Sequence, residues 1–274
     1  MIYLRLAGGL GNQLFQVAAA SLYSQWIDQR ISLIKDGLSR YDSPRDLLFS
    51  QILQPKDGSW FFSNPNSLIG ICSGRIRLGR LPIPVLSVND RNISRPIHSQ
   101  TFRLPRFMDG YFQRFWTYEL FCKALSGFTI HSLPEVLPIS LGNARVAVHI
   151  RGSDFLRVKG FDVCDSIFYL NCFGKAIASG YNCFGVYTDD LAYSESILSP
   201  IRSRYPWIVI EVASSGSVLD DFYGIRTASA RIIGNSTFAW WAAALSLGGP
   251  TWSSPYIVEQ RRRPFALDGE IYVT

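Results

Sequence analysis

Four short segments hold the side chains that could carry out chemistry, and each follows an apolar stretch that predicts a β-strand. The segments are GGLGNQ at 8–13, HIRGSDF at 149–155, TDD at 188–190 and GNSTF at 234–238. In an open parallel sheet, ligands bind outside the carboxyl ends of the strands. The positions of these segments therefore predict a ligand site at the carboxyl edge of a sheet.

HIRGSDF places Arg151 and Asp154 directly after its predicted strand. An arginine can form a pair of hydrogen bonds with a phosphate group, and the aspartate can orient the arginine or accept a proton. His149 precedes Arg151 by two residues, so both are predicted on the same face of the strand. The alternative is a plain ion pair between Arg151 and Asp154, since structural ion pairs are commoner than catalytic ones.

GNSTF joins a strand end to the start of a helix, with Asn235 or Ser236 as the capping residue. The unpaired backbone N–H groups and the hydroxyls at such a helix start form an anion site without a metal ion. The helix is apolar on every side, with Trp240 and Trp241, which predicts that it is buried. The alternative is an ordinary capped core helix.

TDD allows three interpretations: a metal site, a pair of acceptors for a guanine base, or the N-cap of a helix that begins near Leu191. Two adjacent aspartates have the wrong spacing for the DxD motif of metal-dependent sugar transferases. We therefore predict no metal ion.

GGLGNQ has three glycines within four positions, Gly8, Gly9 and Gly11. Glycine costs backbone entropy, so such a cluster predicts left-handed backbone or room for a ligand against the main chain. The segment differs from the dinucleotide-binding pattern GxGxxG, because Gln13 stands where the third glycine belongs. A nicotinamide cofactor is not predicted.

Strands that alternate with helices position these segments, and the strands are almost entirely apolar, which predicts a buried parallel sheet. In the second half of the chain we expect strands at 146–150, 184–188, 207–212 and 231–234 and helices at 166–179, 192–205, 218–229 and 236–247. In the first half we expect a strand at 2–6, a helix at 12–28, a strand at 108–112 and a helix at 116–125. The region 31–106 shows no motif, and 132–143 is the expected linker.

The composition predicts a globular protein. The chain has 274 residues, of which 47% are hydrophobic and 18% charged, so two lobes with substantial cores are expected. Five cysteines without CxxC spacing argue against a disulfide framework and a zinc site. No stretch has the length and hydrophobicity of a membrane span, and we expect a cytoplasmic protein, which leaves peripheral contact with a membrane open.

The net charge of +6 suits a partner that carries phosphates. A nucleic-acid-binding or carbohydrate-binding module would place aromatic residues on exposed strands and basic residues along one stripe. Here the most aromatic segment belongs to an apolar helix, and the basic residues are scattered. The run Arg261–Arg263 is predicted to be a solvated end, and no nucleic-acid partner is expected.

Taken together, the segments resemble the α-1,2-fucosyltransferases, which move L-fucose from GDP-fucose onto galactose. GGLGNQLFQ is similar to the family's GGLGNQMFQ, DGYFQ at 109–113 to its GYFQ, VAVHIRGSDF to its VSVHIRRGDY, and IIGNSTFAWWAAAL to its IIANSTFSWWAAWL. VYTDD resembles the family's short aspartate segment. One departure stands out: Gly152 replaces the second of the family's paired arginines, and Arg157 or Lys159 could supply the missing charge.

The resemblance implies an α/β protein of GT-B-like fold, with two Rossmann-like lobes that face a cleft and a parallel sheet in the C-terminal lobe. Residues 1–140 would form the acceptor-side lobe with the glycine loop, and residues 141–274 the lobe that binds GDP-fucose. The oligomeric state cannot be derived from the sequence.

The resemblance also implies an inverting, metal-independent transfer of L-fucose from GDP-β-L-fucose to the 2-OH of a terminal galactose, with no cofactor. Arg151 and Asp154 are the expected catalytic residues. Asp154 is nominated as the base, and a mechanism without a base stays open. Two alternatives also stay open: another sugar-nucleotide-dependent transferase of the same fold, and a non-catalytic protein that binds carbohydrate or nucleotide.

The residues expected to bind substrate follow from the same resemblance. His149 with Asp189 or Asp190 would hold the guanine, while Ser236 and Thr237 would bind phosphate oxygens. The full set expected around the donor is Gly9, Gly11, Asn12, His149, Arg151, Asp189, Asp190, Asn235, Ser236, Thr237 and Phe238. Tyr111 and Gln113 are the expected acceptor-binding residues.

Overall fold

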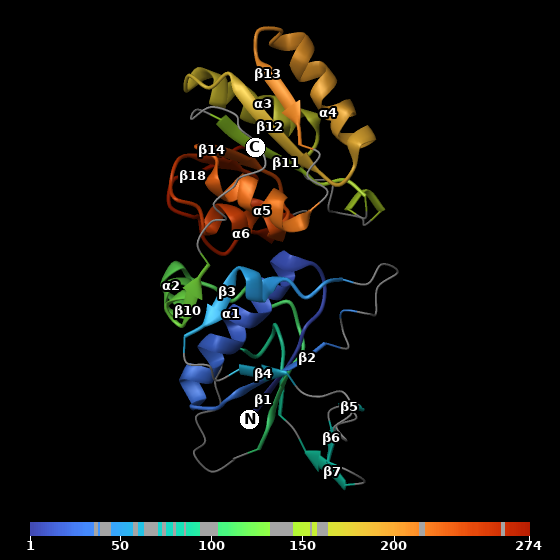
Figure 1. Ribbon diagram of the computed structural model, residues 1–274, viewed down its shortest axis with the longest axis vertical. Coiled ribbons are helices and arrows are strands. Elements are labelled where there is room, and N and C mark those ends of the chain that lie inside the picture. The colour runs from blue at the N-terminus through green and yellow to red at the C-terminus, as the bar shows by residue number, and fades with distance from the viewer. Residues whose placement is uncertain are drawn as a thin grey trace. The chain divides into compact units, whose positions relative to one another are not determined.

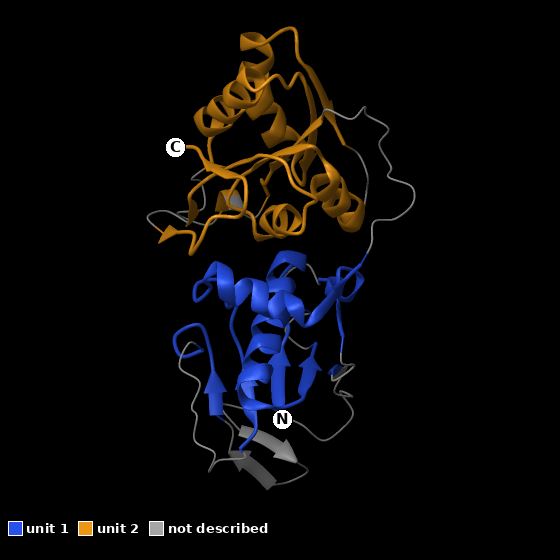
Figure 2. Cartoon of the chain, turned by 90° about the vertical axis from the view of Figure 1, so that its left-hand side faces the viewer, with its two compact units in different colours: residues 1–132 blue, residues 133–274 orange. Residues whose placement is uncertain are grey.

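The structure is a computed structural model that divides into two compact units, Met1–Ser132 and Leu133–Thr274 (Figure 2). It describes residues 1–35, 38, 45–56, 60–62, 71–72, 75–78, 81–84, 86–93, 104–131, 145–153, 155–157, 164–213, 217–258 and 261–274. The predicted boundary at 140/141 and the predicted linker at 132–143 lie outside these ranges.

The N-terminal unit is built on a five-stranded parallel sheet with the order β4-β2-β1-β9-β8 (Figure 1). Its strands are β1 (Ile2–Arg5), β2 (Ile31–Ile34), β4 (Trp60–Phe62), β8 (Leu86–Val88) and β9 (Arg106–Met108). Helix α1 (Leu10–Ile27) follows β1 directly, as the sequence predicts. The leucine and alanine side chains of α1 are buried, so the helix and the glycine segment that precedes it are fixed to the core.

Smaller elements complete the N-terminal unit. Strand β3 (Leu53–Pro55) pairs antiparallel with β10 (Phe128–Ile130), and β5 (Ile71–Cys72), β6 (Arg75–Leu78) and β7 (Leu81–Pro84) form an antiparallel sheet. The 3-10 helix η2 (Phe49–Gln51) precedes β3. Helix α2 (Tyr118–Ser126) begins after Thr117, whose hydroxyl accepts a hydrogen bond from the backbone N–H of Leu120.

The strand predicted at 108–112 is wrong, because β9 ends at Met108. Phe112 adopts a left-handed backbone with φ of 52°, which no strand contains. Its carbonyl accepts a hydrogen bond from Trp116 Nε1 at 2.6 Å, and both side chains are buried. The apolar residues therefore pack in a turn that is held by the indole.

The C-terminal unit is a six-stranded parallel sheet with the order β13-β12-β11-β14-β15-β18. Its strands are β11 (Arg145–Ile150), β12 (Cys183–Thr188), β13 (Val209–Val212), β14 (Ala230–Ile233), β15 (Thr251–Ser253) and β18 (Glu270–Tyr272). Counted within the unit, this order is 3-2-1-4-5-6, that of a doubly wound Rossmann sheet. The order in which the strands are added to the sheet reverses between β11 and β14, which is where such sheets bind ligands.

Four helices cover the sheet: α3 (Ser166–Ala178), α4 (Leu191–Arg204), α5 (Val218–Thr227) and α6 (Thr237–Ala244). Side chains of α3 and α4 share one core cluster with Val146, Val148 and Ile150 of β11. Because side chains alternate along a strand, His149 points to the opposite face, where its ring contacts Phe238 of α6. The expected parallel sheet and its helices are confirmed, with ends that differ by at most two residues except at the C-terminal end of α6.

The remaining elements of this unit are the 3-10 helix η3 (Phe155–Arg157) and the antiparallel pair β16 (Tyr256–Val258) and β17 (Arg261–Arg262). Among the described residues, none of the helices has the length and apolar character that a bilayer crossing requires.

Candidate functional site

Three of the four predicted segments meet at one edge of the C-terminal sheet. Strand β11 pairs in parallel with β12 on one side and with β14 on the other, so the residues that follow each strand lie at the same edge. HIRGSDF, TDD and GNSTF occupy these positions. The first and last of them flank the point between β11 and β14 where the strand order reverses.

Arg151 forms an ion pair with Asp189, with Nη1 at 2.6 Å from Oδ2. The other oxygen of Asp189, Oδ1, accepts a hydrogen bond from the backbone N–H of Gly152 at 2.9 Å. The two side chains keep 24% and 30% of their surface exposed. Asp189 therefore fixes the guanidinium at a place that water and solutes reach. The partner proposed in the alternative, Asp154, lies outside the described residues.

Asp190 is the N-cap of α4, because its Oδ1 accepts from the backbone N–H of Tyr193 at 3.0 Å. Its Oδ2 accepts from the backbone N–H of Ser153 at 3.2 Å. These bonds, that from Tyr193 first, hold the pKa of the Asp190 carboxyl below its ordinary value. The structure thus realises the helix-cap alternative for TDD, and the predicted contact of Asp190 with guanine stays a prediction.

The packing around Gly152 explains why a glycine stands where the family pattern has its second arginine. A Cβ atom at this position would lie 2.5 Å from Cβ of Asp190, closer than two carbon atoms can approach. A side chain here therefore requires Asp190 to move, although Asp190 caps α4. Asp190, the N-cap of α4, therefore leaves no room for an arginine side chain at position 152.

Replacing Gly152 with alanine is expected to lower the free energy of unfolding by about 1–3 kcal/mol, because the methyl group overpacks against Asp190. Urea unfolding would measure this, with a double-mutant cycle as the control. In an Asp190→Gly background the collision is relieved, so the same substitution should cost much less. Equal costs in both backgrounds would contradict the steric explanation.

His149 is buried, with 6% of its surface exposed, and its ring centroid lies 5.5 Å from that of Phe238. Its Nδ1 has no hydrogen-bond partner among the described residues. The pKa of His149 is lowered to about 4, mainly by burial and also by the positive charge of Arg151, while the negative charge of Asp189 acts in the opposite direction. A neutral imidazole thus joins the end of β11 to the start of α6.

The lowered pKa makes stability depend on pH. The unfolded chain binds a proton at His149 near pH 6.5 and the folded chain only near pH 4, so stability is complete above 6.5 and is lost as the pH falls toward 4. From about pH 7.5 to about pH 5 this residue should cost about 2 kcal/mol in the free energy of unfolding. Urea unfolding of the protein and of His149→Gln would measure it; an equal pH dependence in the variant would refute the assignment.

The GNSTF turn leads into α6, whose N-cap is Ser236. Ser236 makes no side-chain capping hydrogen bond, although it is buried, so its hydroxyl does not satisfy the amides of the first helical turn. Asn235 instead donates from Nδ2 to the carbonyl of Ile257 at 3.0 Å. Trp240 and Trp241 are buried, as expected. The turn is therefore fixed to the core, and the Ser236 side chain at the N-cap makes no capping hydrogen bond to the first turn of α6.

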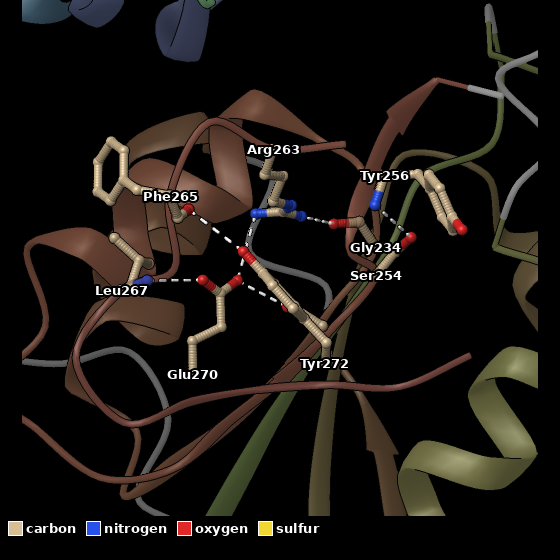
Figure 3. Close-up of polar contacts among 9 residues, drawn as sticks. Gly234, Ser254, Tyr256, Arg263, Phe265, Leu267, Glu270 and Tyr272 are labelled. Atoms are coloured by element: carbon tan, nitrogen blue, oxygen red, sulfur yellow. Dashed lines mark hydrogen bonds and ion pairs between the residues drawn. The ribbon is translucent and has the colours of Figure 1, made fainter. Parts of the chain in front are cut away.

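Arg263 is a site residue that the sequence analysis missed. Arg261 and Arg262 are exposed as expected, but the side chain of Arg263 is only 4% exposed. Its Nη2 donates to the carbonyl of Gly234 at 2.6 Å (Figure 3). The prediction of a solvated run is wrong for this residue. No local pattern could have revealed it, because its partners are Gly234, which follows β14, and Glu270.

The glycine segment of the N-terminal unit has both properties that its composition suggested. Gly8 is left-handed with φ of +79°, and a Cβ there would lie 2.5 Å from Nδ2 of Asn12. At Gly9, by contrast, a Cβ would meet nothing within 4 Å. No neighbouring atom of the described residues therefore requires a glycine at position 9. The open space beside it agrees with the predicted approach of a ligand.

The side-chain amides that follow the glycines hold neighbouring segments in place by hydrogen bonds. Gln13 and Gln16 are buried; Gln13 donates to the carbonyls of Gly8 and Asp46, and Gln16 donates to the carbonyl of Gly110. Asn12 accepts a hydrogen bond from Gln113 Nε2 at 2.9 Å. The glycine segment and the DGYFQ segment are thus brought together within this unit.

The two predicted acceptor residues differ in setting. Tyr111 is 39% exposed and its backbone N–H donates to Asp90 Oδ2 at 3.1 Å, while Gln113 is held by Asn12. Their binding roles stay predictions, as do those of Gly9, Gly11 and Asn12. Within the described ranges, no three His, Cys, Asp or Glu side chains gather as a metal site, and metal independence also stays a prediction.

Comparison with protein-family models matches residues 129–263 to glycosyl transferase family 11. Through these residues, just under half of the chain, the sequence is similar to that family. The matched range contains HIRGSDF, TDD, GNSTF and Arg263, so the family segment coincides with the carboxyl edge described above. A comparison with curated protein sequences finds no match.

Several solved structures share the fold of this chain. The fucosyltransferase NodZ from Bradyrhizobium matches with a TM-score of 0.51 at 14% identity over 89% of this chain and 93% of its own. POFUT1 in complex with GDP matches with a TM-score of 0.61 at 12% identity over 92% and 98%. FUT1 from Arabidopsis thaliana matches with a TM-score of 0.54 at 13% identity over 95% and 71%. The mixed α/β fold with parallel sheets is that of GT-B-like fucosyltransferases.

Proposed function

We propose that this protein is an inverting fucosyltransferase that moves L-fucose from GDP-β-L-fucose to the 2-OH of a terminal galactose. The match of residues 129–263 to glycosyl transferase family 11 and the fold shared with NodZ and POFUT1 support fucosyl transfer. NodZ is named an α-1,6-fucosyltransferase, and it and POFUT1 were solved with GDP. The α-1,2 linkage rests on the four motifs of this sequence.

The observation that carries the proposal is the position of Arg151 and of the GNSTF turn. They follow β11 and β14, the neighbouring strands between which the sheet order reverses. This is where a Rossmann sheet binds a nucleotide diphosphate. A fixed guanidinium and the N-terminal end of α6 therefore supply positive potential in the place where the donor is expected.

The proposed reaction requires a positive electrostatic potential at this place. When the bond between fucose and phosphate breaks, negative charge builds on the departing GDP while the sugar becomes cationic, so the site must stabilise the leaving group. Arg151 would bind the diphosphate, and Asp189 would keep the guanidinium in place. Ser236 and Thr237 would add hydrogen bonds to phosphate oxygens at the start of α6. These groups replace a metal ion in the proposed mechanism.

The remaining roles are assigned on the same basis. His149, neutral because burial lowers its pKa to about 4, would border the guanine with Asp189 or Asp190. Asp154 would accept the proton of the acceptor hydroxyl, and Gly9, Gly11 and Asn12 would approach the fucose or the phosphates.

A nucleotide titration tests the donor. Thermal-shift curves with GDP, UDP and ADP should show a clear preference for GDP, because the proposed donor carries guanine. Equal shifts for the three would remove the guanine assignment and favour another sugar-nucleotide transferase of the same fold.

A transfer assay tests the reaction. Radiolabelled GDP-fucose and a galactoside acceptor should give an α-1,2-linked product whose anomeric configuration is inverted, and the rate should survive EDTA. No transfer to any galactose-ended acceptor would leave the binding-protein alternative, and a strict metal requirement would contradict the proposed stabilisation of GDP.

A further inference from the structure

Arg263 contacts the GNSTF turn by a charged hydrogen bond inside the protein. Its Nη2 donates to the carbonyl of Gly234 at 2.6 Å, and the side chain is 4% exposed (Figure 3). A charged donor binds a carbonyl more strongly than a neutral one, and burial keeps water from competing. The direction of the peptide group between Gly234 and Asn235 is therefore set by this guanidinium.

Glu270 holds Arg263 in turn. Its Oε1 lies 3.5 Å from Nη1 of Arg263, and its side chain is completely buried. The same carboxylate accepts from Ser253 Oγ at 2.6 Å and from the backbone N–H of Leu267 at 2.7 Å (Figure 3). A carboxylate held by these two donors restricts the orientation of the guanidinium that faces it. The charge is neutralised as a buried ion pair requires.

The opposite side of the same peptide group is also fixed. The backbone N–H of Asn235 and the hydroxyl of Ser254 are hydrogen-bonded to the thiol of Cys164. Burial raises the pKa of this thiol to about 11, so it stays neutral. A Cβ on Gly234 would lie 3.1 Å from the Tyr169 hydroxyl, so the turn is closely packed as well. Arg263 supplies the charged contact among these.

We propose that Arg263 is a positioning residue for the diphosphate site, because it fixes the Gly234–Asn235 peptide group and thereby aims the groups at the start of α6. The inference rests on the proposed function, in which Ser236 and Thr237 bind the phosphates of the donor. Arg263 acts through the turn, because its Nη2 donates to Gly234 and its Nη1 faces Glu270.

The test compares GDP with guanosine, which lacks the phosphates. Arg263→Met should weaken GDP binding about tenfold, the value of a charged hydrogen bond, and leave guanosine binding unchanged. Calorimetry measures GDP and ligand-observed NMR measures guanosine. A merely structural role lowers the melting temperature without changing the ratio of the two affinities. Arg261→Met is the matched control, since it removes the same charge from an exposed residue of β17 and should leave the ratio as it is.

Arg263→Lys keeps the charge but not the planar fork that serves both acceptors, so it should lose about threefold in GDP affinity. If Arg263→Met does not fold, the lysine variant decides. The inference is overturned if folded Arg263→Met has the same ratio of GDP affinity to guanosine affinity as the wild-type protein. If Arg263→Met does not fold, the same result with Arg263→Lys overturns it.

Failure of the proposed function gives a different result. In that case the wild-type protein itself binds GDP no better than guanosine, and the inference falls with it. A wild-type preference for GDP that Arg263→Met preserves refutes the positioning role alone.

Discussion

Replacing Arg151 with alanine is expected to lower kcat/KM for transfer from GDP-fucose by about 10²–10³-fold, which is the cost of losing one preorganised group at a developing charge. The structure gives the reason: Asp189 fixes the guanidinium at the carboxyl edge of the sheet, with Nη1 at 2.6 Å from Oδ2. The substitution removes this charge where the diphosphate is expected to leave. The loss should appear in kcat as well as in KM, since the charge on GDP grows as the bond breaks.

Steady-state kinetics with GDP-fucose and a galactoside would measure the effect, with the melting temperature as the check on folding. Arg151 is about three-quarters buried on the side chain, but Asp189 keeps its hydrogen bond from Gly152, so the fold should persist. Arg204→Ala, on the exposed end of α4, is the matched loss of one positive charge and should change nothing. An Arg151→Ala variant of near-normal activity would remove this residue from the mechanism.

In the C-terminal unit the strands β11 to β14 and the helices α3 to α6 were predictable because each carries its own signal, whereas β15 and β18 were not predicted. The strands of a parallel sheet are buried on both faces, so β11, β12 and β14 appear as short apolar runs. The helices between them begin at side chains that accept hydrogen bonds from the helical amides, such as Asp165, Asp190 and Ser217. Local apolar runs and helix caps therefore made these elements predictable from the sequence.

The N-terminal unit was much less predictable between 31 and 106. Its strands there are two to four residues long, too short to show a period, and β4 and β8 take their places in the sheet through pairing with β2 and β9. The turn at Phe112 depends on Trp116, and a left-handed phenylalanine has no signature in the sequence. Such elements are decided by tertiary contacts rather than by local propensity.

The segments of the site could be found from the sequence, whereas their partners could not. The rule that ligands bind at the carboxyl ends of parallel strands selected three segments that the fold brings to one edge. The ion pair of Arg151 with Asp189 and the contact of Arg263 with Gly234 join residues far apart in the chain. Without a structure, nothing distinguished Arg263 from the exposed arginines beside it.

Removing both hydroxyls at the start of α6, in Ser236→Ala/Thr237→Ala, is expected to weaken GDP binding about 10²-fold, since each hydrogen bond to a charged group contributes about 1.5–3 kcal/mol. Ser236 is buried at the N-cap and makes no side-chain capping bond, so the loss should fall on the ligand rather than on the helix. The backbone amides of the turn remain, which is why binding is weakened and not abolished.

Calorimetric titration with GDP would measure this loss, and guanosine serves as the internal reference because it does not carry the phosphates. Its affinity should be unchanged if the hydroxyls bind phosphate oxygens alone. Ser246→Ala, just beyond the C-terminal end of α6, is the matched control and should retain full GDP affinity. Equal losses for GDP and guanosine would move the two hydroxyls to the nucleoside side. Undiminished GDP binding would mean that the diphosphate does not lie at this helix start, and the proposed stabilisation of the leaving group would have to rest on Arg151 alone.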